Sequence, residues 1–376
     1  NLFKSHGVKT VQLLSLILYA FNLFFLSKCL KKIVMNRWFH FAIVTFFALV
    51  PVHLHYAYMI MNYVLSTCLA SLFFYLLVRS SGKTDLGPSD YLGCGLCVVA
   101  GIMTSLSSAV FFPVGFMYFA LYPRIAFKKK IFGLICFFSG VITLLYPYYQ
   151  IRTKVFGQFF MTAHREPLDV KWTNYHKIYP IEFYTHYDLG AFKESYLGDD
   201  WRERPVKQRH LRQGLWPMLH QTLYSDYFNY QVDSKTSQET RDAGGLIHTG
   251  LHYLTKEKAR QFTVLDYLGI PISVLFLFVI FKWLWNAVLF LVFRSKDHFL
   301  DMICLSTAAL IFFQFMVYIL QYPNYVNISA GYLFPGIFLL CLGLAKFLKG
   351  TWVSRAVAVY LFVYAAFSYY VFYKRC

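Results

Sequence analysis

Two basic residues follow the end of an apolar run in PYYQIRTKVFGQFF (147–160). Arg152 and Lys154 come shortly after Pro147 and a pair of tyrosines. An arginine fork matches the oxygen atoms of a phosphate group, and a lysine adds a compact positive charge. The two residues predict a phosphate site. The alternative is that they only reach toward lipid headgroups, as long basic side chains commonly do.

The gap PVHLHYAYMIMN (51–62) between two apolar runs holds His53 and His55. Their spacing suits a loop or a strand rather than one face of a helix. A metal site would need further ligands, which the neighbouring sequence does not supply, so we expect no metal here. The histidines are candidates for contact with a substrate or a lipid phosphate, with anchoring at a membrane interface as the simpler alternative.

A polar junction leads into apolar sequence in QYPNYVNISAGYLFPGIFLL (321–340). Asn324, Asn327 and Ser329 carry groups that could bind hydroxyls, and Tyr332 follows them. Irregular polar backbone at membrane depth is tolerated where it lines a cavity. The junction therefore predicts the rim of a membrane-embedded site, or else a polar interfacial loop that ends where the next helix begins.

One acidic residue, Asp226, lies among aromatic residues in LYSDYFNYQ (223–231). A carboxylate in such a cluster could act as a general base or bind a sugar hydroxyl. It could equally cap a helix. Asp226 is therefore a candidate catalytic residue with an ordinary structural alternative.

Other patterns that carry chemistry are missing from the sequence. Cys94 and Cys97 have CxxC spacing, but they lie in an apolar run without a second pair or a nearby histidine, so we expect buried small side chains. The sequence contains no phosphate-binding P-loop, no dinucleotide fingerprint after a strand, no HExxH and no GxSxG.

The composition indicates an integral membrane protein. Of the 376 residues, 58% are hydrophobic and 14% are charged, and the mean hydropathy is +0.47. A soluble domain has about a quarter charged residues. The net charge of +18 would suit nucleic acid, but many Lys and Arg residues flank apolar runs, where topology and lipid headgroups explain them. We expect membrane lipid, and no nucleic acid, as a partner.

Apolar segments of membrane-spanning character recur along the chain and predict about ten transmembrane helices, because helices satisfy their own backbone in lipid. The segments are 10–28, 38–52, 58–78, 91–106, 108–123, 131–149, 264–292, 299–320, 329–347 and 352–372.

Basic residues gather in every second gap between these segments. By the positive-inside rule those gaps lie in the cytoplasm, and the intervening gaps and the long segment 150–262 lie in a lumen or periplasm. The basic residues are Lys28, Lys31, Lys32, Arg37, Arg79, Lys83, Arg124, Lys128, Lys129, Lys130, Arg294, Lys296, Lys346 and Lys349.

The segment 150–262 holds 13 of the 18 acidic residues, which marks it as a polar region outside the membrane. Its length predicts a small folded cap or an interaction surface rather than a plain loop. We expect helical stretches around Pro217 and an amphipathic helix over 248–268. The chain thus divides into 1–149 with about six spans, the cap, and 263–376 with about four spans.

The order of these motifs resembles that of the polytopic GT-C glycosyltransferases, in particular the protein O-mannosyltransferases and the bacterial aminoarabinose transferases. Each matching stretch is similar to one family feature. They are 51–79 (third and fourth spans), 91–121 (glycine-rich helical hairpin), 147–160 (a span end with Phe-Gly), 223–231 (a loop motif near Asp-Tyr) and 329–340 (the start of a late helix).

The resemblance implies an all-α polytopic fold that transfers a sugar from a polyprenyl-phosphate carrier to an acceptor. The reaction would take place on the luminal face of the endoplasmic reticulum or the periplasmic face of a bacterial inner membrane. It implies Arg152 and Lys154 as phosphate ligands. The implied cavity residues are His53, His55, Asp226, Asn324, Asn327 and Tyr332.

Two departures from the family pattern bear on catalysis. Gly331 stands where the late motif often has an arginine, and the family's first span and first acidic outer loop have no counterpart in this sequence. The family's catalytic acid therefore cannot be assigned to a residue here. The sequence could be truncated, a partner membrane protein could supply the missing part, or the chain could be a non-catalytic GT-C-like subunit. A lipid or small-solute transporter is a third reading, disfavoured by the scarcity of acids inside the apolar segments.

Overall fold

The computed structural model describes residues 2–34, 36–53, 62–83, 85–123, 125–156, 184–185, 215–225, 256–293, 295–321, 333–350 and 352–373. These residues are helical or connect helices, and none of them lies in a strand, as the sequence predicted. The helices are α1 (Leu2–Ile33), α2 (Arg37–Leu49), α4 (Asn62–Ser80), α5 (Pro88–Thr104), α6 (Phe111–Leu121), α7 (Phe127–Phe156), α12 (Leu215–Tyr224), α14 (Lys256–Phe293), α15 (Phe299–Gln321), α16 (Phe334–Leu348) and α17 (Trp352–Tyr373).

Five of these helices are long and apolar enough to cross a membrane. The apolar stretches are Gln12–Ile33, Phe127–Ile151, Arg260–Phe293, Phe299–Ile319 and Trp352–Phe372. A span needs about 20 residues at 1.5 Å each. By that measure α2, α6 and α16 are short, with 13, 11 and 15 residues. This architecture fits a multi-pass integral membrane protein.

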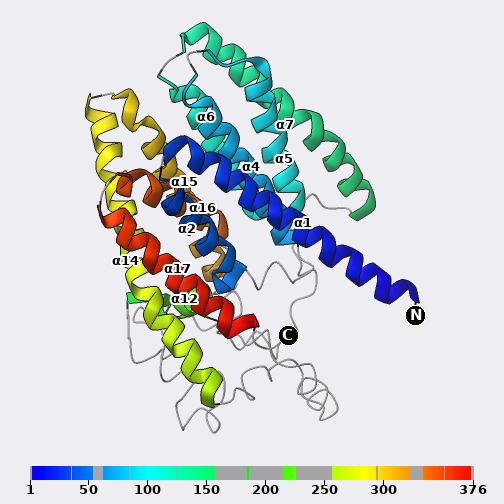
Figure 1. Cartoon of the computed structure of the whole chain (residues 1–376). Helices are drawn as coiled ribbons and strands as arrows, with labels where there is room; N and C mark the ends of the chain where they lie inside the picture. Colours follow the sequence, from blue (N-terminus) through cyan, green and yellow to red (C-terminus); the bar gives the residue numbers. More distant parts are fainter. Residues whose placement is uncertain are drawn as a thin grey trace.

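Five pairs of consecutive helices are each connected at the same end of the bundle, at the upper left of Figure 1. The pairs are α1–α2, α4–α5, α6–α7, α14–α15 and α16–α17. We call this the basic end, because the described basic residues that the sequence analysis assigned to the cytoplasmic gaps lie there, such as Lys32, Lys83 and Lys349. The opposite end is the far end. The ammonium of Lys32 donates to the carbonyl oxygen of Arg79 at 3.3 Å, which joins the ends of α1 and α4.

Glycines let α5 and α7 pack closely. A Cβ atom on Gly95 would lie 2.4 Å from the carbonyl oxygen of Phe137, and one on Gly133 would lie 2.0 Å from the ring of Tyr91. Small residues bring helix backbones together in membranes, where apolar burial adds little to helix association. Gly95 of the predicted hairpin and Gly133 of α7 thus serve helix packing.

The segment 150–262 contributes helix α12 to the bundle at the far end (Figure 1). This helix spans Pro217, where the sequence predicted helical stretches. Leu215 and Leu219 of α12 pack against Phe315 and Ile319 of α15. The predicted helix over 248–268 is described from Lys256 onward, as the first turns of α14.

Candidate functional site

Few of the residues singled out from the sequence fall within the described part of the chain. Six of them lie outside the described residues: His55, Asp226, Asn324, Asn327, Ser329 and Tyr332. The remaining three are placed: Arg152 and Lys154 occupy the last turns of α7 at the far end, and His53 follows α2 at the same end. The Lys154 side chain is exposed, so it remains available to a ligand or a headgroup.

His53 is fully buried beneath aromatic rings. Its ring centroid lies 4.0 Å from that of Phe47 and 6.3 Å from that of Tyr19, both edge-on. The Nδ1 atom hydrogen-bonds to the carbonyl oxygen of Phe47, so it must carry the proton. Burial lowers the pKa of His53 to about 3. The imidazole is therefore neutral at physiological pH and offers a phosphate no charge.

Two buried polar side chains on α1 and α4 lack partners among the described residues. Asn22 of α1 is 1% exposed and Ser71 of α4 is 1% exposed. Among the described residues, neither amide atom of Asn22 nor the hydroxyl of Ser71 has a hydrogen-bond partner. An unpaired buried polar group is costly, so both groups suit a ligand or water that offers hydrogen bonds.

Asn22 and Ser71 lie at nearly the same height in the bundle. The rings of Phe25 and Tyr75 stack with centroids 5.7 Å apart, which aligns α1 with α4. Asn22 comes three residues before Phe25 and Ser71 four before Tyr75, and the two helices run in the same direction. At 1.5 Å per residue their heights agree within about 2 Å. They can therefore contribute to one polar region.

A second polar cluster joins α12 to α14. The Nε2 atom of His220 lies 2.8 Å from the carbonyl oxygen of Asp266, and Nδ1 lies 3.3 Å from the hydroxyl of Ser273. A carbonyl only accepts, so Nε2 carries the proton and Nδ1 accepts from Ser273. The histidine thus bonds the backbone of Asp266 and not its carboxylate, which differs from a Ser-His-Asp catalytic triad.

This cluster continues to α17. The hydroxyl of Tyr364 donates to the carbonyl oxygen of Tyr224 at 3.0 Å. A Cβ atom on Gly269 would lie 2.4 Å from the Tyr224 ring, so the missing side chain is what lets α12 seat against α14. Burial lowers the pKa of His220 to about 4, which keeps the ring neutral in the docked state.

Asp266 is the carboxyl at the centre of this cluster, and it is fully buried. Its Oδ2 accepts from the Gln221 amide at 3.4 Å, whereas Oδ1 has no partner among the described residues. An acid within an apolar helix is a functional candidate by default. In the sequence this signal is weak, because Asp266 lies near the start of the predicted segment 264–292, where an acid is less unusual than in mid-span.

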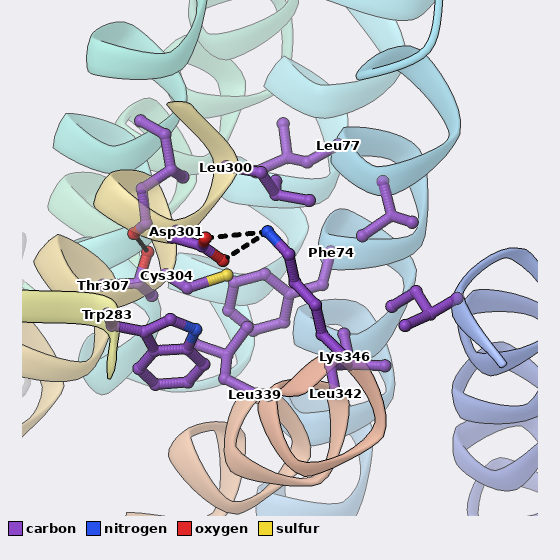
Figure 2. Close-up of a pocket in the computed structure, with 14 residues that line it drawn as sticks. Phe74, Leu77, Trp283, Leu300, Asp301, Cys304, Thr307, Leu339, Leu342 and Lys346 are labelled. Atoms are coloured by element: carbon purple, nitrogen blue, oxygen red, sulfur yellow. Dashed lines mark hydrogen bonds and ion pairs between the residues drawn. The ribbon is translucent and has the colours of Figure 1, made fainter. Parts of the chain in front are cut away.

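A third polar group lines a small cavity near the basic end, shown in Figure 2. Lys346 of α16 donates to both oxygens of the Asp301 carboxylate at 2.8 and 2.7 Å, and Asn286 donates to Oδ2 at 2.7 Å. The cavity has a volume of about 30 Å³, and apart from this pair and Thr307 it is lined mainly by apolar side chains such as Leu77 and Trp283. It has room for water, but not for a sugar.

The far end therefore combines neutral hydrogen-bonding groups with a buried carboxyl and the basic residues of α7. Within the described part of the chain, no three His, Cys, Asp or Glu side chains gather as metal ligands would.

Comparison with protein-family models, with curated proteins and with solved structures finds no match to this chain.

Proposed function

We propose that this chain is a GT-C-type glycosyltransferase that moves a sugar from a polyprenyl-phosphate carrier to an acceptor on the luminal or periplasmic face. The observation that carries the proposal is a set of buried polar atoms without partners among the described residues. They belong to Asn22 and Ser71, midway along α1 and α4, and to Asp266 near the far end of α14. In a protein with membrane-length apolar helices, such groups favour a polar ligand inside the bundle. The order of the sequence motifs supplies the class of reaction.

The proposed topology has about ten spans. The shorter helices would be tilted or would cross the membrane packed between longer neighbouring helices. The basic end then faces the cytoplasm, because positive residues are retained there. The far end and α12 face the lumen of the endoplasmic reticulum or the bacterial periplasm. This orientation puts Arg152, Lys154 and Asp266 on the side where a polyprenyl-phosphate sugar is consumed.

In this reaction a carboxylate takes the proton of the acceptor hydroxyl while the acceptor oxygen attacks the anomeric carbon. The bond from that carbon to the phosphate oxygen breaks, and the polyprenyl phosphate leaves with the electron pair. Arg152 and Lys154 would stabilise the phosphate charge that develops. Asn22, Ser71 and the neutral His53 would bind uncharged hydroxyls.

A non-catalytic subunit of a larger membrane complex is the second candidate. The burial of Asp266 beneath α12 favours it, because the docked helix closes this carboxyl to an acceptor. A partner chain with an acidic outer loop would then provide the catalytic acid, and α12 would belong to the contact surface.

Donor binding tests the proposal. The full chain in lipid nanodiscs is exposed to a panel of polyprenyl-phosphate sugars and to sugar-free polyprenyl phosphate, and bound lipid is counted by native mass spectrometry. We expect retention of at least one sugar-bearing donor, weakened by Arg152→Gln. Absence of any preference for phosphorylated polyprenyl lipids over phosphatidylcholine would contradict the transferase and favour the non-catalytic subunit.

A further inference from the structure

Helices α2 and α17 both begin at the basic end with an exposed tryptophan and an exposed arginine. Trp38 is 74% exposed and Trp352 is 80% exposed. Arg37 and Arg355 are exposed as well. The side chain of Asn36 accepts from the backbone nitrogen of Trp38 at 2.9 Å, which caps α2 and fixes where its first turn lies.

The two arginines lie along the same edge, where α2 meets α17. The rings of Phe41 and Phe362 are 5.4 Å apart across that edge. Arg37 is one turn before Phe41, and Arg355 is two turns before Phe362, so each shares a helix face with its phenylalanine. At 1.5 Å per residue the arginines lie about 6 and about 10 Å below the ring pair, a difference that two long side chains can bridge.

The surroundings of this edge are positive. Neither α2 nor α17 contains an acidic residue. Of the four described acids near the basic end, three are paired with lysines, in Lys83–Asp90, Lys129–Asp85 and Lys346–Asp301. The fourth, Asp297, is exposed and lies in the connection between α14 and α15, on neither α2 nor α17. The two guanidinium groups therefore lie on helices that carry no counter-charge, and they suit an anion.

Above the arginines the same edge is apolar and open to the bilayer. Val359 and Val363 continue the stripe of Trp352 and Arg355 at helical spacing, and they are 64% and 54% exposed. Phe41 on the neighbouring helix is 56% exposed. A ligand with a charged head and a hydrocarbon chain matches this order of groups, with tryptophans at the level of the headgroup.

We propose that the α2–α17 edge is a binding site for an anionic membrane phospholipid, with the lipid phosphate held between Arg37 and Arg355. The guanidinium forks donate to the phosphate oxygens. The indoles of Trp38 and Trp352 lie at the interface, and an acyl chain runs along Phe41, Val359 and Val363. This site lies at the end opposite to the proposed sugar-transfer site and does not depend on that function.

The test uses the full chain in nanodiscs of phosphatidylcholine doped with phosphatidylserine, with lipid retention measured by native mass spectrometry. We expect Arg37→Gln combined with Arg355→Gln to reduce the preference for phosphatidylserine at least tenfold. The matched control is Lys128→Gln with Lys349→Gln, which removes two exposed charges from other elements at the same end. It should change the preference for phosphatidylserine less than twofold. The double variant Arg37→Lys with Arg355→Lys should show a preference for phosphatidylserine between those of the native protein and the Arg→Gln pair, because a lysine keeps the charge and loses the guanidinium fork.

An equal loss in the control pair would overturn the proposal and leave only a general attraction of the basic end to anionic membranes. Unchanged preference in the Arg→Gln pair would overturn it as well. A thermal unfolding scan of each variant in the same nanodiscs shows whether it is folded, and phosphatidylserine should raise the unfolding temperature of the native protein and not that of the Arg→Gln pair.

Discussion

Loss of Lys346 is expected to destabilise the bundle through the carboxylate that it leaves behind. Lys346→Met removes two of the three hydrogen bonds that Asp301 accepts, and the Asp301 side chain is only 2% exposed. Breaking a buried ion pair at one partner costs about 3–5 kcal/mol. The Lys346 side chain is 31% exposed, so water lowers the expected cost to about 2–4 kcal/mol. Unfolding in mixed micelles titrated with SDS measures this free energy.

The exposed pair Lys129–Asp85 provides a matched control. Its nitrogen-to-oxygen distance is also 2.7 Å, but its side chains are 61% and 63% exposed. Lys129→Met should therefore cost no more than about 1 kcal/mol. Replacing both buried partners, with Asp301→Leu and Lys346→Met, should recover most of the loss because no charge is left unpaired. Equal effects of the two single substitutions would refute the argument from burial.

Three further outcomes are expected. Gly269→Val should release α12 from α14, because even a Cβ atom would lie 2.4 Å from the Tyr224 ring. Release is measured as faster proteolysis around 215–224. Unchanged cleavage would show that α12 does not dock through the contact of Tyr224 with Gly269. The free energy that holds α12 in its docked position should fall by up to about 3 kcal/mol as the pH is lowered from 6.5 to 4. Docked His220 has a pKa of about 4, whereas an undocked histidine has its ordinary pKa near 6.5, so protonation favours the undocked state. Hydrogen-exchange protection factors of α12 measure this, and His220→Gln should remove the pH dependence. Asn22→Leu should raise the free energy of unfolding by about 1–2 kcal/mol and weaken binding of sugar-bearing donors; a destabilised variant with normal binding would show that Asn22 is structural.

Hydrophobic segment length predicted most of the fold. Each of the ten apolar segments overlaps a described helix, because long apolar runs form helices wherever backbone groups cannot reach water. The boundaries were less accurate. α14 begins at Lys256 rather than at 264, since the amphipathic turns before the apolar run continue the same helix. Whether the short helices cross the membrane stays a prediction.

The sites were harder to predict because their partners are distant in the chain. Asp301 pairs with Lys346 across 45 positions, and His220 reaches the carbonyl of Asp266 across 46. Neither pairing produces a local pattern in the sequence, although an acid within an apolar run does indicate a candidate site. His53 was predicted as a contact for a substrate or a lipid phosphate. Its burial gives a neutral ring, and the contact itself stays a prediction. The GT-C resemblance stays a prediction.

The central claim is that this chain transfers a sugar, and turnover of the donor tests it most directly. The full chain in nanodiscs is incubated with polyprenyl-phosphate sugars labelled in the sugar, together with native membranes as the source of acceptor, and released polyprenyl phosphate is measured over time. We predict release coupled to labelling of an acceptor, reduced at least tenfold by Arg152→Gln and unchanged by Lys128→Gln at the basic end. Donor that binds but never turns over, with or without added membranes, would contradict catalysis by this chain and favour the non-catalytic subunit.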